Sequence, residues 1–275
     1  MTSDPTRFLT PPRSRPRLIA GVFNYCDAWC SRCVFQQQCR VYLDRRKFEA
    51  ALEEGEEAVK RLSEHHDENE YEYEDDGRPP VTEAQKAEFL AMVTEANNYK
   101  LTNEEARRFA AAERKKRALQ KKHPLAMKGR AYMNALWDLQ EPMTEMVAAT
   151  GDPLVTAAFE VVAHHAFLIG GKAHRATSGL IWVDDDDDGD DPEERCGVQS
   201  DSNGCAKLMR IAIAESRDAW SVLFTTPALS TEGLPGEMLE RLEDLDREIQ
   251  LHFPRAMEFV RPGFDDRIGG EDVER

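Results

Sequence analysis

The segment LVTAAFEVVAHHAFLIGGKAHRA, residues 154–176, carries apolar side chains on almost every side of a helix. A helix that is apolar all round is typically buried at the centre of a larger fold. Asp152 and Pro153 come directly before it, and an N-cap aspartate followed by proline at the first helical position favours a helix start. We therefore expect a helix that begins at Pro153 and forms the buried centre of a helical bundle.

Other helices are indicated by capping residues and by apolar side chains three or four positions apart. Thr82 with Gln85, and Thr102 with Glu105, each pair a hydroxyl with a reciprocal acceptor three residues later. The expected helices cover residues 41–63, 83–100, 103–122, 124–149, 204–224 and 235–252. For the fifth of them, Asp201, Ser202 or Asn203 would be the cap. Alternating β-branched runs and Asn-Gly hairpins are absent, so the expected fold class is all-α.

The chain divides into segments of different composition, and a helical bundle with an N-terminal cysteine-rich metal-binding segment accounts for them. The expected parts are a disordered tail at 1–17, a cysteine cluster segment plus helix at 18–64, an acidic linker at 65–80, a helical bundle at 81–264 interrupted by an acidic loop at 184–201, and a disordered tail at 265–275.

Four of the six cysteines lie in NYCDAWCSRCVFQQQC, residues 24–39. Cys26, Cys30, Cys33 and Cys39 are candidate metal ligands with the spacing Cys-x3-Cys-x2-Cys-x5-Cys. Disulfides here would close only tiny loops. A Zn²⁺ site needs four ligands on one tetrahedron and usually draws them from two separate knuckles. A [4Fe–4S] cluster gives each iron its own thiolate, which suits four cysteines on one winding loop better. Nearby apolar side chains are expected to shield the site: Tyr25, Trp29, Val34, Phe35 and Tyr42.

The part CSRCVFQQQC, residues 30–39, resembles the Cys-x2-Cys-x5-Cys iron–sulfur clasp of RecB-like nucleases. The whole segment is similar to the N-terminus of uncharacterised bacterial helical proteins with a Cys-Asp-x-Trp-Cys-x-x-Cys motif. These resemblances imply a ligand set only, because the Asp…Glu-x-Lys constellation of the nucleases is missing. The first three cysteines also match the spacing of radical-SAM enzymes, but Arg32 stands where that family usually has an aromatic residue.

The net charge of −16 and the pI near 5.0 make nucleic acid an unlikely partner. No signal peptide and no run of 18 uninterrupted apolar residues are visible, so we expect a cytoplasmic protein that does not span a membrane. The basic stretch 107–122 is expected to interact with the protein's own acidic loops or to form a solvated helix face.

A second group of candidates lies on the expected bundle helices. Glu160, His164 and His165, with Glu215 and Asp218 on a facing helix, would suit a dinuclear metal centre of the ferritin-like type, although the Glu-x-x-His spacing of that family is missing. The alternative is that these groups pair with nearby lysines or arginines, or satisfy themselves in the core.

Cys196 and Cys205 fit no strong metal spacing, and a buried helix face is the favoured interpretation for Cys205. The function expected is a metal-binding helical protein with a [4Fe–4S] cluster that serves electron transfer, redox sensing or structure, with a redox or protein partner. The alternatives are a zinc-stapled protein-interaction module and a ferritin-like oxidase.

Overall fold

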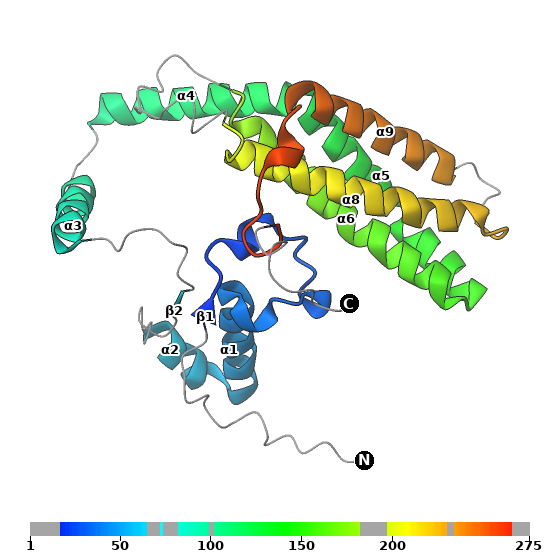
Figure 1. Cartoon of the computed structure of the whole chain (residues 1–275), viewed down its shortest axis with the longest axis horizontal. Coiled ribbons are helices and arrows are strands. Elements are labelled where there is room, and N and C mark those ends of the chain that lie inside the picture. The colour runs from blue at the N-terminus through cyan, green and yellow to red at the C-terminus, as the bar shows by residue number, and fades with distance from the viewer. Residues whose placement is uncertain are drawn as a thin grey trace. The chain divides into compact units, whose positions relative to one another are not determined.

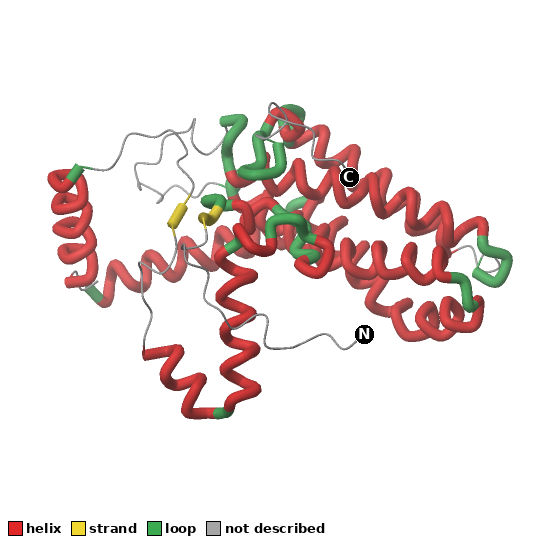
Figure 2. The backbone as a smooth tube through the Cα atoms, turned by 60° about the horizontal axis from the view of Figure 1, so that its bottom comes forward, coloured by secondary structure: helices red, strands yellow, loops and turns green. Residues whose placement is uncertain are grey.

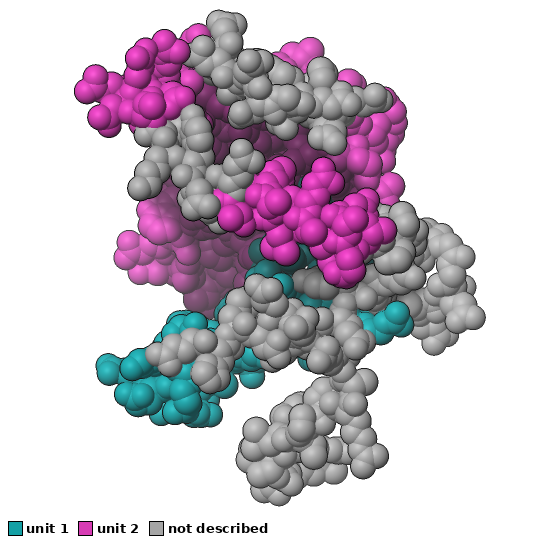
Figure 3. All heavy atoms as spheres, turned by 90° about the vertical axis from the view of Figure 1, so that its left-hand side faces the viewer, with its two compact units in different colours: residues 1–80, 261–275 teal, residues 81–260 magenta. Residues whose placement is uncertain are grey.

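The computed structural model describes residues 17–64, 72–73, 82–98, 102–181, 197–229 and 234–265. These residues form an all-α protein, in which the described strands are two residues long (Figure 2). The chain divides into two compact units (Figure 3). The cysteine unit comprises residues 1–80 and 261–275, and the bundle unit comprises residues 81–260.

The bundle unit contains α3 (Glu83–Asn98), α4 (Asn103–Lys122), α5 (Pro124–Thr150), α6 (Pro153–Ser178), α8 (Asp201–Thr225), α9 (Leu234–His252) and the short 3-10 helix η6 (Ala256–Glu258) (Figure 1). The cysteine unit contains β1 (Arg17–Leu18), three 3-10 turns, α1 (Arg40–Glu54), α2 (Glu56–Glu64) and β2 (Glu72–Tyr73), which pairs in parallel with β1.

The core of the bundle unit lies between α5, α6, α8 and α9, and α6 packs most extensively against α8 and α5. Val162, Ala166 and Ile169 of α6 are completely buried, as the apolar character of this segment predicted. The burial is not all round, however, because Leu154 and Phe167 are 73% and 47% exposed. Four apolar residues spaced three or four positions apart on α9 are all buried: Met238, Leu242, Leu245 and Ile249.

Local capping explains where several helices begin. Asp152 accepts a hydrogen bond from the backbone N–H of Leu154 at 2.8 Å, as predicted. Thr102 and Glu105 form the predicted reciprocal capping box at the start of α4. The cap of α8 differs from the prediction, since Ser200 accepts from the N–H of Asn203 and the helix begins at Asp201. The predicted cap was therefore one to three positions too late, since residues 201–203 belong to the first turn of α8.

The helix expected over residues 41–63 is broken into α1 and α2 at Gly55, whose φ of 111° is not helical. Its apolar pattern does not mark a buried face, because Val41, Phe48 and Leu52 are each about half exposed. The predicted tails, the acidic linker and the acidic loop at 184–201 lie largely outside the described residues.

By length and composition alone, α6 is long and apolar enough to cross a membrane. A core helix of a soluble protein passes the same test, and α6 packs against α5 and α8 along the bundle core. This helix is therefore not in itself evidence of a membrane span.

Two glycines allow α5 and α6 to approach closely. A Cβ atom on Gly129 would lie 2.5 Å from Cβ of Ala173, and one on Gly170 would lie 2.8 Å from Sδ of Met133. At the neighbouring Gly171 an added Cβ would meet no atom within 4 Å, so only the first glycine of the pair is needed for packing.

Gly129→Ala should therefore destabilise the protein, by about 1–3 kcal/mol, because an overpacked contact must push the two helices apart. Gly171→Ala is the matched control, and it should stabilise by about 0.5–1 kcal/mol through helix propensity. Urea unfolding followed by circular dichroism measures both free energies. Equal effects of the two substitutions would contradict the close approach.

A buried polar chain links α5 and α8 inside this core. The indole N–H of Trp220 donates to the hydroxyl oxygen of Tyr132 at 3.0 Å, and both side chains are completely buried. Ser216 also hydrogen-bonds to Tyr132. Desolvation by burial raises the pKa of Tyr132 to about 12, although the hydrogen bonds with Trp220 and Ser216 act to lower it.

Because the folded pKa of Tyr132 is raised, its contribution to stability is complete below pH 10 and is lost as the pH rises towards 12. Tyr132→Phe should cost about 1–3 kcal/mol at neutral pH, because it leaves the buried indole N–H of Trp220 without its acceptor. This deficit should shrink between pH 10 and pH 12, since only the wild type loses about 2–3 kcal/mol there. Urea unfolding measured across this pH range gives the difference in unfolding free energy between the wild type and Tyr132→Phe. A difference that stays constant from pH 10 to pH 12 would refute the assignment.

Candidate metal centre

The four N-terminal cysteines lie on one winding loop between β1 and α1. Cys26 ends the turn η2 (Val22–Tyr25), Cys30 opens η3 (Cys30–Arg32), Cys33 closes it, and Cys39 is the residue before α1. The 3-10 turn η4 (Gln36–Gln38) separates the last two. A bond from the N–H of Ile19 to the carbonyl of Gln38 at 3.0 Å fixes the loop to the end of β1. Short turns in succession thus bring thiols that are up to thirteen positions apart to the same place.

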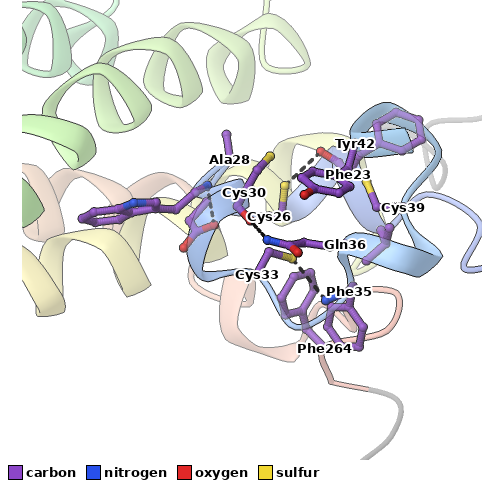
Figure 4. Close-up of a pocket in the computed structure, with 13 residues that line it drawn as sticks. Phe23, Cys26, Ala28, Cys30, Cys33, Phe35, Gln36, Cys39, Tyr42 and Phe264 are labelled. Carbon is purple, nitrogen blue, oxygen red and sulfur yellow. Dashed lines mark hydrogen bonds between the residues drawn. The ribbon is translucent and has the colours of Figure 1, made fainter. Parts of the chain in front are cut away.

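All four cysteines line a single pocket with about 320 Å³ of space between its atoms, part of it open to solvent. Figure 4 shows Phe23 and Tyr42 on one side of the pocket and Phe35 with Phe264 on another. Val22 and Cys39 are buried beneath it, together with Ile19. The four thiols are free, and those of Cys26, Cys30 and Cys33 are half-buried.

The predicted shielding is correct in part. Trp29, Phe35 and Tyr42 line the pocket, whereas Tyr25 is not among the lining residues and Val34 is 84% exposed. Trp29 has the guanidinium of Arg32 stacked 3.7 Å from its ring centroid. A position next to a cysteine in the sequence does not determine which way the turn directs the side chain, so two of the five expected residues do not line the pocket.

Burial and nearby acidic groups raise the pKa of two of the four thiols, those of Cys26 and Cys33. Desolvation raises the pKa of Cys26 and of Cys33, and Asp27 and neighbouring cysteines raise both further. Backbone N–H groups act in the opposite direction. The N–H of Phe35 donates to Sγ of Cys33 at 3.4 Å, and the backbone of Ala28 hydrogen-bonds to Cys26. The loop therefore already directs donors at sulfur atoms that would carry negative charge as metal ligands.

Ala28 reaches this position through an unusual backbone conformation. Its φ is +61°, a region that a residue with a Cβ enters only at some cost. Oδ1 of Asp27 accepts a hydrogen bond from the N–H of Trp29 at 2.9 Å and holds the turn from the other side. Backbone strain of this kind clusters at functional sites.

The last described residues of the chain complete the pocket wall. The ring of Phe264 meets the ring of Phe35 edge to face, with 4.9 Å between centroids. Arg261 lies over Phe264 and pairs with Asp265 at 3.0 Å. Gly263, at φ +78°, passes so close to Ile19 that a Cβ there would lie 3.2 Å from it. Sequence reasoning missed Phe264, because nothing in its local sequence connects it with cysteines more than 200 positions earlier.

The second group of candidates is brought together only in part. Glu160, Glu215 and Asp218 are exposed, while His165 is buried with Nδ1 3.3 Å from Oγ of Ser216 and Nε2 3.4 Å from Glu215. His164 is half-buried, with its ring edge towards that of His165. This arrangement matches the alternative of histidine satisfied in the core and does not favour a dinuclear centre.

Cys205 is completely buried on α8, as expected for a small residue on a buried helix face. Desolvation raises the pKa of its thiol to about 11. Cys196 lies outside the described residues, as do residues 65–66 with their two histidines. Among the residues that the structure describes, no group of three or more His, Cys, Asp or Glu side chains converges closely enough to hold a single metal ion.

Comparisons with protein-family models, with curated proteins and with solved structures found no match to this chain.

Phe264→Ala should open the cysteine pocket, because it removes the ring that packs on Phe35. We expect Cys33 and Cys39 of the unloaded protein to react severalfold faster with a maleimide, as measured by peptide mass spectrometry. Phe167→Ala, which removes a partly exposed ring from α6, is the control and should leave both rates unchanged. Identical rates in the wild type and in Phe264→Ala would show that Phe264 does not shield the thiols.

Proposed function

We propose that this protein is a metal-binding protein whose cysteine unit holds a [4Fe–4S] cluster through Cys26, Cys30, Cys33 and Cys39. The observation that carries the proposal is that all four thiols line one pocket with largely apolar walls. Soft thiolate ligands select iron–sulfur clusters, zinc or Cu(I), so the donor set fits this class of cofactor.

The arrangement of the thiols favours a cluster over a single ion. They lie on one continuous winding loop and line a single pocket. Tetrahedral zinc would need four sulfur atoms at about 2.3 Å from one centre. A cubane places its irons apart and takes one thiolate on each, so its ligands stand further from one another. Zinc, the rival cofactor, usually draws its four ligands from two separate knuckles.

The surroundings of the thiols fit a redox or structural cluster. A bound cluster would supply a one-electron redox centre whose potential depends on hydrogen bonds to sulfur and on exposure to solvent. Phe35 and Ala28 supply backbone contacts to two of the sulfur atoms. Phe23, Tyr42 and Phe264 limit the access of water. We infer a role in electron transfer, redox sensing or structure, with a redox or protein partner.

The proposal is tested by anaerobic purification, followed by a visible spectrum and by iron, sulfide and zinc analysis of one sample. We expect a brown protein with about four iron and four sulfide per chain. One zinc and no colour would instead support a zinc-stapled interaction module. A chain that binds neither metal after reconstitution would refute the metal site altogether.

Substitution of single cysteines tests the ligand set. Cys30→Ala and Cys33→Ala should each lose most of the metal, because formation of the site and local folding are coupled. Cys205→Ala is the matched control, since this thiol is buried in α8 and should not affect metal content. Wild-type metal stoichiometry in both ligand variants would contradict the assignment.

A further inference from the structure

The helix α4 has a strongly basic surface. Residues 107–122 contain eight lysines and arginines and a single acidic residue, in a chain of net charge −16. Arg114, Lys121 and Lys122 are exposed, and the side chain of Arg117 is 72% exposed although it pairs with Glu113. We call the exposed basic residues of 107–122 the basic face of α4. Like charges concentrated on one exposed helix favour an anionic partner.

The packing of α4 places this basic face next to one end of α6. Gln120 is buried, and its Nε2 donates to the backbone carbonyl of His174 at 2.6 Å. His174 lies in the last two turns of α6, which ends at Ser178. Lys121 and Lys122 directly follow Gln120, so the C-terminal end of the basic face lies close to the point where the chain leaves α6.

The chain returns to the same place at the start of α8. Arg175 of α6 binds Asp201 through two hydrogen bonds of 2.6 and 2.8 Å, which ties the end of α6 to the beginning of α8. Residues 182–196 connect these two helices and lie outside the described residues. This connection contains nine aspartates and glutamates between residues 184 and 194.

The geometry points to a specific occupant for the basic face. We propose that the acidic segment 184–194 of the same chain docks on the basic face of α4 and neutralises it. A loop of fifteen residues anchored at both ends reaches about 25 Å from its base, at 3.3–3.6 Å per extended residue. The distance along α4 from Gln120 back to Arg107 is about 20 Å, at 1.5 Å per residue. The middle of the acidic segment is therefore able to extend over the length of this face.

Docking of this kind depends on charge and therefore on salt. The Debye length falls from about 30 Å at 0.01 M salt to about 3 Å at 1 M. An acidic segment held by the exposed basic face should therefore be attached at low salt and released at high salt.

The experiment is carbodiimide cross-linking of the full chain, which joins a lysine amine directly to a carboxylate that it touches. At low salt we expect links from Lys121 and Lys122 to carboxylates of residues 184–194, with a severalfold lower yield at 1 M salt. A mixture of ¹⁴N- and ¹⁵N-labelled protein distinguishes links within one chain from links between two chains.

Arg114→Gln with Arg117→Gln weakens the basic face but keeps both reactive lysines, so the yield of these links should fall severalfold. The control is Arg241→Gln with Arg247→Gln, which removes the same charge from α9 and should leave the yield unchanged. An undiminished yield in the α4 variant, or no such links at low salt, would overturn the proposal. Mixed-label links in the statistical proportion expected for pairing between chains would overturn it in favour of a second copy as the occupant.

Discussion

Gly129 allows the backbone of α5 to approach Ala173 of α6 more closely than any residue with a side chain would permit. The bundle core depends on this contact, because α6 packs on α5 along one side and on α8 along the other. The buried chain from Trp220 to Tyr132 then ties α5 to α8. An apolar core alone specifies orientation poorly, and a satisfied polar chain inside it helps to select one arrangement of the helices.

The first residues of several helices were predictable, because local chemistry determines where a helix begins. Asp152 and Thr102 cap α6 and α4 as expected, since a capping residue acts on amides only two or three positions away. Burial was harder to predict. Phe48 and Leu52 follow a helical pattern and yet are about half exposed, while Phe167 is exposed on the most apolar helix. A pattern of residues shows that a face exists, but it does not show what packs against that face.

The candidate site likewise contains features that were predictable from the sequence and features that were not. The cysteines are close in sequence, so their spacing already indicated that they could share one site. The ring of Phe264 comes from the far end of the chain, and Ala28 adopts a left-handed conformation that its residue type does not favour. Neither feature has a local signal. Both arise because tertiary packing, which a single sequence does not display, overrides local preference.

The cysteine unit is built from two pieces of chain, residues 1–80 and 261–275, and the whole bundle is inserted between them. When the cysteine unit is folded, the two ends of the inserted chain are held together even if the bundle itself unfolds. Closing a loop of about 180 residues lowers the entropy of the unfolded bundle and raises its free energy by on the order of 5 kcal/mol. Whatever keeps the small unit folded thus acts as a cross-link for the large one, without touching any residue of its core.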